Sequence, residues 1–413
     1  MHTFDLMIDN ARVVTCDGPD TTPLERLGVL DRASVGVRGD RIAYLGPPVG
    51  EPAARRIDAG GRVLLPGLVD PHTHLVFAGS RVDEMARRMA GEDYRAIAAA
   101  GGGIKATVRA SRTASDEELY QRARARALAL RSRGVTSVEV KSGYGLTVED
   151  ELRHLGVARR LEREGVVHVT TSLLGAHAIP PEYTDDRPAY VRLVAERMVP
   201  EAAAKGLADA CDVYLDDGAF TADEAETVLG AAKTAGLAVR AHVGQFADLG
   251  GAERLAALGG LSADHLEHVS DAGLRAMAAA GVTAVLLPGA WRTLRQEAPD
   301  AARMRAFGVR IAVGTDLNPG TSASPDLPLA AALAVRDAGL TLEEAVLSIT
   351  VDAARAAGFD DVGRIAVGLR ADLAIFDEED PRALPYSLGG PLPSTTILGG
   401  RIAFERAPDT PLW

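Results

Sequence analysis

The sequence is poor in cysteine and in aromatic residues. Cys16 and Cys211 are its two cysteines, and they lie far apart in the chain. Such a pair argues against a disulfide framework, and neither cysteine has the neighbours expected of a metal ligand or a nucleophile. Aromatic residues make up only 4% of the chain. The core is therefore expected to consist of small aliphatic side chains.

The sequence also lacks an excess of positive charge, a long apolar run and a secretion signal. Its net charge of −12 argues against nucleic acid and anionic membranes as partners. No apolar run is long enough to span a bilayer, and Met1–Arg12 lacks the basic-then-apolar pattern of a signal peptide. These absences predict a cytoplasmic enzyme that acts on a small molecule. A homodimer is the default expectation for its assembly.

The 413 residues suffice for a large barrel and an accessory domain. Short apolar segments, most of them separated by helical segments, are predicted to be parallel strands. They are Val63–Val69, Val135–Val140, Val166–Leu174, Ala210–Leu215, Leu237–His242, Ser262–Val269, Val282–Leu287 and Val309–Val313. This alternation predicts an α/β protein with a (β/α)8 TIM-type barrel.

Signals for helix ends support this alternation. Ser115 and Thr221 are each followed three residues later by a glutamate, which is the pattern of a capping box. Glycines stand where helix C-termini are expected, at Gly134, Gly165, Gly236, Gly281 and Gly308. Further helices, over Asp326–Asp337 and Thr341–Ala357, are expected to cover the outside of the barrel.

Both ends of the chain have a different pattern, with short β-like segments separated by turns. These segments are Asp5–Cys16, Ala33–Leu45, Arg56–Val63, Gly363–Phe376 and Thr395–Phe404. We therefore expect one small β-sandwich domain formed by residues 1–64 and 363–413. The barrel is expected to occupy residues 65–362.

Histidines gather at the predicted strand ends. His72 and His74 follow the first barrel strand and share one face, because side chains alternate along an extended segment. Taken alone, this pair could equally be two exposed histidines. Six of the nine histidines lie at such places, namely His72, His74, His177, His242, His265 and His268. The set favours a site at the C-terminal ends of the barrel strands, where TIM-barrel enzymes hold their catalytic groups.

Four of these strand-end residues can converge on one metal ion. Three imidazoles, from His72, His74 and His242, and the carboxylate of Asp316 form a ligand set that suits one divalent zinc or iron ion. Such an ion lowers the pKa of its water and makes hydroxide available. The fourth strand ends without a lysine that could bridge two metals as a carbamate, which favours a single ion.

Several motifs together resemble one enzyme family. They are Asp70–Arg81 with its His-Thr-His, Gly101–Ile104, Lys141–Leu146, Leu174–Ala178, Ser262–Leu266 and Thr315–Thr321. With these motifs the chain resembles, nearly end to end, the imidazolonepropionase family of the metal-dependent amidohydrolase superfamily. The resemblance implies hydrolytic opening of 4-imidazolone-5-propanoate to N-formimidoyl-L-glutamate in histidine degradation.

The resemblance also implies roles for individual residues. His265 and Asp316 would move protons, and Arg81 would pair with the substrate's propionate, although it could instead be a surface partner of Asp83 or Glu84. The implied substrate-binding residues are Arg81, Tyr144, His177, Gln245, Asn318, Gly320 and Thr321. Many family members have a glutamate in the segment after the histidine of the fifth strand. In this chain that segment reads His242-Val243-Gly244-Gln245, and an amide cannot take up a proton at neutral pH.

The sequence leaves alternatives open for the role of Lys141 and for the function of the chain. Lys141 is equally compatible with a structural and a functional role, and Gly101–Gly103 is expected to be a loop that covers the substrate. Another single-metal amidohydrolase, such as a deaminase of a heterocyclic amine, is an alternative function. A non-catalytic barrel is a second alternative, but such chains usually lose metal ligands, and this one keeps all four.

Overall fold

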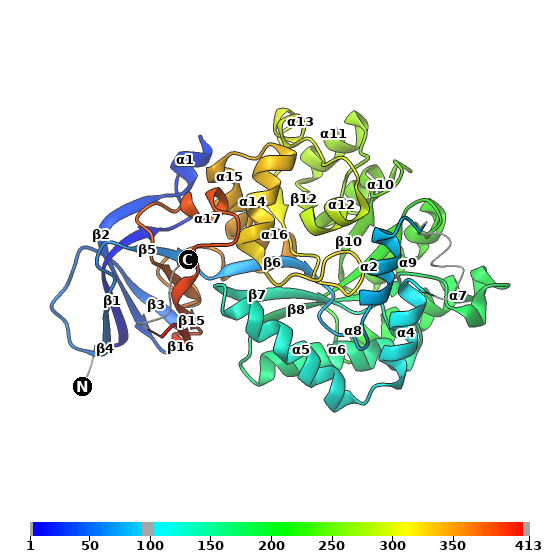
Figure 1. The fold of residues 1–413 in the computed structure, drawn as a ribbon, viewed down its shortest axis with the longest axis horizontal. Coiled ribbons are helices and arrows are strands. Elements are labelled where there is room, and N and C mark those ends of the chain that lie inside the picture. The colour runs from blue at the N-terminus through cyan, green and yellow to red at the C-terminus, as the bar shows by residue number, and fades with distance from the viewer. Residues whose placement is uncertain (1–2, 93–101, 408–413) are drawn as a thin grey trace.

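Two sheets organise the molecule, one in a barrel and one built from both ends of the chain. The structure is a computed structural model that describes residues 3–92 and 102–407. Figure 1 shows the sheet of terminal strands on the left and the barrel with its surrounding helices on the right. Each sheet has eight strands.

The barrel sheet is parallel throughout, in sequence order. Its strands are β6 (Leu68–Thr73), β7 (Val135–Lys141), β8 (His168–Ala176), β9 (Ala210–Leu215), β10 (Ala238–Val243), β11 (Ser262–His265), β12 (Thr283–Leu286) and β13 (Ile311–Val313). Most are buried on both faces, which explains their continuous apolar character in the sequence.

The first and last barrel strands close the ring. The backbone N–H of Asp316 donates to the carbonyl of His72 at 3.0 Å, and that of His74 donates to the carbonyl of Leu317 at 3.1 Å. A parallel bridge joins Thr73 and Leu317. The predicted TIM-type barrel is confirmed, and its closure lies beside the histidines.

Helices cover the outside of the barrel. They are α2 (Val82–Met89), α4 (Ile104–Thr113), α5 (Asp116–Arg131), α6 (Val148–Arg163), α7 (Arg187–Leu193), α8 (Val199–Ala204), α9 (Ala222–Thr234), α10 (Gly251–Ala257), α11 (Asp271–Ala280), α12 (Pro288–Leu294), α13 (Ala301–Ala306), α14 (Leu327–Ala338), α15 (Leu342–Ser348) and α16 (Val351–Ala357). Short turns of helix lie at Pro181–Tyr183 and Val194–Met198.

The predicted helix ends are present. Ser115 accepts a hydrogen bond from the backbone N–H of Glu118, and Thr221 and Glu224 form a reciprocal capping box. The glycines expected after helices all adopt positive φ, from 65° at Gly165 to 91° at Gly134. Only glycine adopts this conformation without strain.

The second sheet joins the two ends of the chain. It contains β1 (Phe4–Val14), β2 (Val29–Arg38), β3 (Arg41–Gly46), β4 (Ala53–Asp58), β5 (Val63–Pro66), β14 (Leu373–Phe376), β15 (Pro393–Leu398) and β16 (Arg401–Glu405). Its apolar face encloses a cluster of its own, with Ile8, Val35, Leu64 and Ile375 among its members. Two short helices in the terminal segments, α1 (Pro23–Arg26) and α17 (Ala383–Tyr386), contact α15 on the barrel side.

One predicted strand is divided in the structure. Val63–Val69 was expected to be a single strand, but it separates at Gly67 into β5 and β6. A side chain at Gly67 would meet the hydroxyl of Thr136, because a Cβ there would lie 2.2 Å from that oxygen. Since β5 belongs to the terminal sheet and β6 to the barrel, Gly67 is the single residue between the two sheets. The domain boundaries at residues 64 and 362 stay a prediction.

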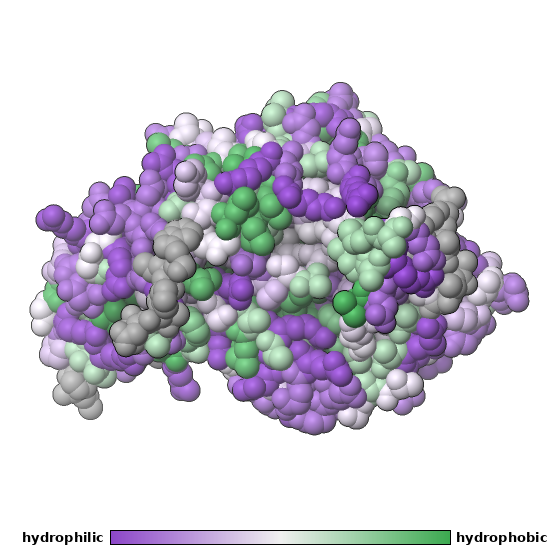
Figure 2. Space-filling model, in the orientation of Figure 1, coloured by the Kyte–Doolittle hydropathy of each residue, from purple (hydrophilic) through white to green (hydrophobic). Residues whose placement is uncertain are grey.

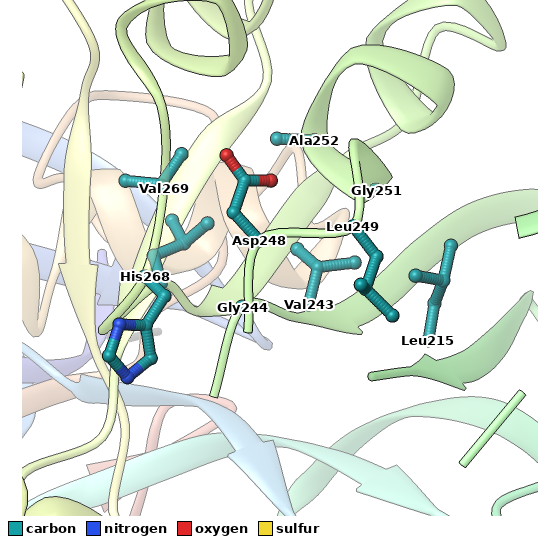
Figure 3. A pocket seen from close by; sticks show the side chains of 10 residues that line it. Leu215, Val243, Gly244, Asp248, Leu249, Gly251, Ala252, His268 and Val269 are labelled. Carbon is teal, nitrogen blue, oxygen red and sulfur yellow. The ribbon is translucent and has the colours of Figure 1, made fainter. Parts of the chain in front are cut away.

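A second predicted strand is shorter than expected. Ser262–Val269 ends at His265, because His265 and Leu266 take positive φ values of 83° and 67° and turn the chain away. His268 is consequently exposed and lines a separate small pocket with Asp248 and Val269 (Figure 3). The expectation that strand six carries both His265 and His268 is wrong for His268.

Polar side chains cover most of the molecular face in Figure 2, and apolar residues lie in scattered patches. One group of exposed apolar side chains belongs to α2, where Val82, Met85 and Met89 face outward. Among the described residues, no helix has the length and apolar character needed to cross a membrane.

His154 makes the fold sensitive to acid. It lies in α6, is 1% exposed, and neither ring nitrogen has a hydrogen-bond partner within residues 3–92 and 102–407. Burial lowers its pKa from 6.5 to about 3. Between these two pKa values the unfolded chain binds a proton at His154 and the folded chain does not. The contribution of His154 to the free energy of unfolding is therefore fully present above pH 6.5 and is lost as the pH falls toward 3.

We expect His154→Leu to remove part of this sensitivity. Between pH 7 and pH 5 the variant is expected to lose about 2 kcal/mol less free energy of unfolding than the parent chain. Denaturant titrations at the two pH values measure this difference. The matched control is His268→Asn, at an exposed histidine. An equal loss in the parent chain and in His154→Leu would contradict the assignment.

Candidate metal centre and active site

Three histidines meet at the carboxyl end of the barrel strands. His72 lies in β6, His74 follows directly after it, and His242 lies in β10. All three are buried, and one ligand atom from each lies within 4.8 Å of the others. The structure thus brings together the three histidines that the sequence suggested as metal ligands.

Two carboxylates fix how these imidazoles face the centre of the site. Nδ1 of His72 lies 2.6 Å from Asp264 Oδ2, and Nδ1 of His242 lies 3.1 Å from Asp212 Oδ1. A carboxylate accepts hydrogen bonds, so each ring donates from Nδ1 and leaves Nε2 with a free lone pair. This is the tautomer in which Nε2 can bind a metal.

The cluster fits a divalent metal ion. Nε2 of His72 and of His242 has no hydrogen-bond partner in the described part of the chain, although both atoms are buried. Burial, together with neighbouring cationic groups, holds the pKa of His72 and of His74 well below its ordinary value. The rings are therefore neutral at neutral pH, which is the form that binds metals.

Asp316 lies beside the three histidines. Its Oδ1 is 3.5 Å from His72 Nε2 and 3.6 Å from His74 Nε2. Burial raises the pKa of Asp316 to about 6, against the opposing effect of His265 and His242. Its φ of 50° lies in the left-handed region, which non-glycine residues rarely adopt. Such strain is typical of functional positions that the surrounding structure holds in place.

His265 forms the next part of the site. Its ring centre lies 5.5 Å from that of His242 and 6.0 Å from that of His72. Burial alone would lower the pKa of His265, but Glu267, Asp316 and other carboxylates raise it above its ordinary value. Glu267 Oε1 lies 3.7 Å from His265 Nδ1. His265 is therefore a titratable group beside the three histidines.

An aromatic wall completes one side. The ring of His177 stacks on that of His74, with centres 5.3 Å apart and an angle of 16°. Tyr144 contacts both, with ring centres 5.7 Å from His74 and 5.5 Å from His177. Glu151 holds the loop with Tyr144 in place by accepting hydrogen bonds from the N–H groups of Gly143, Gly145 and Leu146.

Gln245 is held from two directions. Its Oε1 accepts a hydrogen bond from the hydroxyl of Tyr214 at 2.7 Å, so its amide NH2 remains as the donor. Its backbone N–H donates to Asp216 Oδ2 at 2.6 Å. Asp216 also accepts from Phe246 and Ala247 and thereby shapes the whole loop after β10.

Arg81 lies against Gly320 in the loop after Asp316 and pairs with a neighbouring carboxylate. Its Nε donates to Glu84 Oε2 at 2.9 Å, and its side chain is 9% exposed. Its guanidinium covers Gly320, where a Cβ would lie 2.1 Å from Nη1. Glu84 also accepts from the N–H of Gly103 at 2.8 Å. Gly101, in the predicted covering loop, lies outside the described residues.

The loop after Asp316 is bonded within itself. Asn318 Oδ1 accepts from the N–H groups of Gly320 at 2.7 Å and Thr321 at 2.8 Å, and its amide donates to the carbonyl of Asp316 at 2.7 Å. Asn318 and Gly320 therefore use much of their hydrogen-bonding capacity on this loop. Thr321 Oγ1 reaches Asp316 Oδ2 at 3.4 Å.

The chain matches the amidohydrolase family over residues 63–403. It is 48% identical to the imidazolonepropionase of Caulobacter vibrioides, over 88% of this chain and 92% of that protein. Its 45% identity to the imidazolonepropionase of Stenotrophomonas maltophilia covers 97% of both proteins. This chain belongs to the imidazolonepropionase family of amidohydrolases. A solved adenosine deaminase from Xanthomonas campestris shares its fold, with a TM-score of 0.71 and 20% identity over 97% of this chain and 93% of that one.

In this imidazolonepropionase-family chain, the three histidines form the metal-binding triad typical of metal-dependent amidohydrolases. Sequence analysis did not single out the two carboxylates behind the triad. Asp212 stands within an otherwise apolar strand, and Asp264 belongs to a motif in which only the following histidine drew attention. A charged residue inside an apolar barrel strand is the signal that could have found both.

Proposed function

We propose that this chain hydrolyses 4-imidazolone-5-propanoate to N-formimidoyl-L-glutamate, a ring opening in histidine degradation. The observation that carries this proposal is the buried triad of His72, His74 and His242 in a chain 48% identical to an imidazolonepropionase over 88% of its length. The substrate is a small molecule. A homodimeric assembly and a cytoplasmic location stay predictions.

One divalent ion, zinc or iron, would be held by the triad and by Asp316. Asp316 supports this role because Oδ1 lies within 3.6 Å of Nε2 in both His72 and His74. When bound, the ion would acidify water and so supply a nucleophile at neutral pH.

Arg81 would bind the propionate of the substrate. Its Nε is engaged by Glu84, so its two terminal nitrogens are the groups that can meet a ligand carboxylate. A guanidinium holds a carboxylate through two parallel hydrogen bonds, which fixes orientation as well as charge. The absence of a side chain at Gly320 leaves the space in which this guanidinium lies.

The remaining substrate-binding residues would orient the ring. Tyr144 and His177 form one wall, and the amide NH2 of Gln245 offers a donor because Tyr214 occupies its oxygen. Asn318, Gly320 and Thr321 would form the opposite rim. Asn318 supports this rim from within, since its side chain holds the other two residues in place.

Two proton transfers accompany the ring opening. Water loses a proton as its oxygen adds to the ring carbonyl carbon, and the ring nitrogen gains a proton as its bond to that carbon breaks. Asp316 and His265 would carry these transfers, and their proximity to the triad and their ability to bind a proton support this role. Gln245 cannot titrate, so it would only orient the substrate.

The first test measures the reaction and its metal requirement together. The purified protein is expected to hydrolyse imidazolonepropionate, which is followed as a loss of its ultraviolet absorbance, and to release no ammonia from cytosine or guanine. Chelation is expected to abolish turnover, and one equivalent of zinc or iron per chain to restore it. Ammonia release would favour a deaminase, and full activity without metal or a need for two equivalents would contradict the single-metal proposal.

The second test concerns Arg81. Arg81→Ala is expected to raise KM by about tenfold or more, because a charged hydrogen-bonded pair is lost, and to change kcat less. Arg81→Lys is expected to restore KM only in part, since an ammonium lacks the two-pronged geometry. Arg87→Ala, which removes a half-buried arginine of α2 that pairs with Glu92, is the control. An unchanged KM in Arg81→Ala would assign Arg81 to the surface pair with Glu84.

The third test separates proton transfer from orientation. His265→Ala is expected to lower kcat by ~10²-fold or more, which is the usual scale of an acid–base group. Gln245→Ala is expected to act mainly on KM, and Gln245→Glu to keep activity while shifting the profile of kcat against pH. His168→Gln, at the opposite end of β8, is the control.

The opposite pattern would contradict this division of roles. If His265→Ala kept a nearly normal kcat while Gln245→Ala lost it, Gln245 would have to position the attacking water itself. The profile of kcat against pH in Gln245→Glu, compared with that of the parent chain, shows whether the new carboxylate adds an ionisation that affects catalysis.

A further inference from the structure

A fully buried ammonium group lies behind the metal-binding triad. Lys141 ends β7, and its side chain has no exposed surface. Its Nζ lies 2.7 Å from Asp212 Oδ2, 3.2 Å from Glu139 Oε1 and 3.4 Å from Asp264 Oδ2. A lysine ammonium has three N–H donors, and here it faces three carboxylates. Neither the proposed ligand set nor the proposed proton transfers use this group.

Two of these carboxylates are the ones that hold the histidines. Asp212 uses Oδ1 for His242 Nδ1 and Oδ2 for Lys141. Asp264 uses Oδ2 for both His72 Nδ1, at 2.6 Å, and Lys141. One ammonium therefore connects two imidazoles that come from β6 and β10, on different sides of the barrel.

The arrangement follows from barrel geometry. Lys141 belongs to β7, Asp212 to β9 and Asp264 to β11, which are the second, fourth and sixth strands of the barrel. Inward side chains of alternate strands form one layer in such a barrel. Here that layer is charged rather than aliphatic, and it lies behind the histidines.

Charge balance explains why the central member is a lysine. Buried carboxylates without a cation are strongly unfavourable. Burial alone would lower the pKa of Lys141, but Asp212, Glu139 and Asp264 raise it above its ordinary value. Lys141 therefore stays charged and keeps the two histidine-binding carboxylates at fixed distances.

We propose that Lys141 is a positioning residue that holds Asp212 and Asp264, and through them the imidazoles of His242 and His72, in the geometry that binds the metal. This inference rests on the metal-binding part of the proposed function and is independent of the substrate. It predicts that loss of the lysine weakens metal binding even when the fold and the charge of the layer are preserved.

The test uses a charge-matched double variant. Lys141→Met with Glu139→Gln removes one positive and one negative charge. Within residues 3–92 and 102–407, the Glu139 carboxylate pairs with Lys141 and Arg240 and with none of the three metal-binding histidines. The net charge of the layer is thus unchanged, while Asp212 and Asp264 lose their common partner. Glu139→Gln alone is the matched control, because it keeps the ammonium.

We expect the double variant to bind zinc about 10–100-fold more weakly than the parent chain, measured by competition with a chromogenic chelator. The visible spectrum of the cobalt-substituted protein is expected to change as well, since it reports ligand geometry. The melting temperature of the metal-free double variant is expected to fall, because two buried carboxylates lose their cation, so zinc binding is measured well below that temperature. In Glu139→Gln, zinc affinity and the cobalt spectrum are expected to stay closer to those of the parent.

Unchanged zinc affinity and an unchanged cobalt spectrum in the double variant would overturn the inference. If that variant does not fold, Lys141→Arg keeps the charge but replaces the compact ammonium by a wide planar group. Parent-like zinc affinity in Lys141→Arg would then overturn it, and weaker binding would support it. Failure of the parent chain itself to bind metal would instead contradict the proposed function.

Discussion

The hydrogen bonds from two imidazoles to Asp264 and Asp212 decide how the metal-binding site is built. Nδ1 of each ring faces a carboxylate and donates to it. Nε2 of His72 and of His242 is therefore the atom directed toward the centre. Both carboxylates lie inside the barrel, where an unpaired charge is unfavourable, so a buried cation has to accompany them. The charged layer at the end of the barrel is thus a consequence of holding imidazoles in a fixed orientation.

Buried carboxylates also shape the loops around the metal site. Glu151 accepts three backbone N–H groups and sets the loop with Tyr144, and Asp216 does the same for the loop with Gln245. Asp70 accepts the N–H and the hydroxyl of Thr315 at 3.0 and 2.5 Å. Asp216 lies just after β9, Glu151 lies on α6, and Asp70 lies within β6. The loops are therefore fixed by hydrogen bonds to rigid elements, although loops carry many of the proposed substrate contacts.

Much of this architecture was accessible from the sequence, because strand and helix patterns alternate clearly. The strand Ala210–Leu215 was predicted with its observed bounds, and the triad followed from histidines at strand ends. The division at Gly67 was not, since the apolar pattern runs through it and only a tertiary contact to Thr136 shows the close approach. The early end of β11 depends on two left-handed residues that nothing in the local sequence marks. The ion pairs of Lys141 with Asp212 and Asp264 could not be predicted either, because they join residues far apart in the sequence that meet only when the barrel closes.

The pairing of β5 with β14 has a consequence for synthesis on the ribosome. One edge of β5 can pair with β1 early, but its other edge needs β14, which begins at Leu373. About 300 residues separate β5 from β14, which corresponds to roughly 15–60 s at about 5–20 residues per second. During that interval the nascent chain carries an unpaired apolar strand edge shortly before His72 and His74, and such an edge is a template for wrong pairing. The terminal sheet can therefore be completed only near the end of synthesis, after the strands and helices of the barrel have been made.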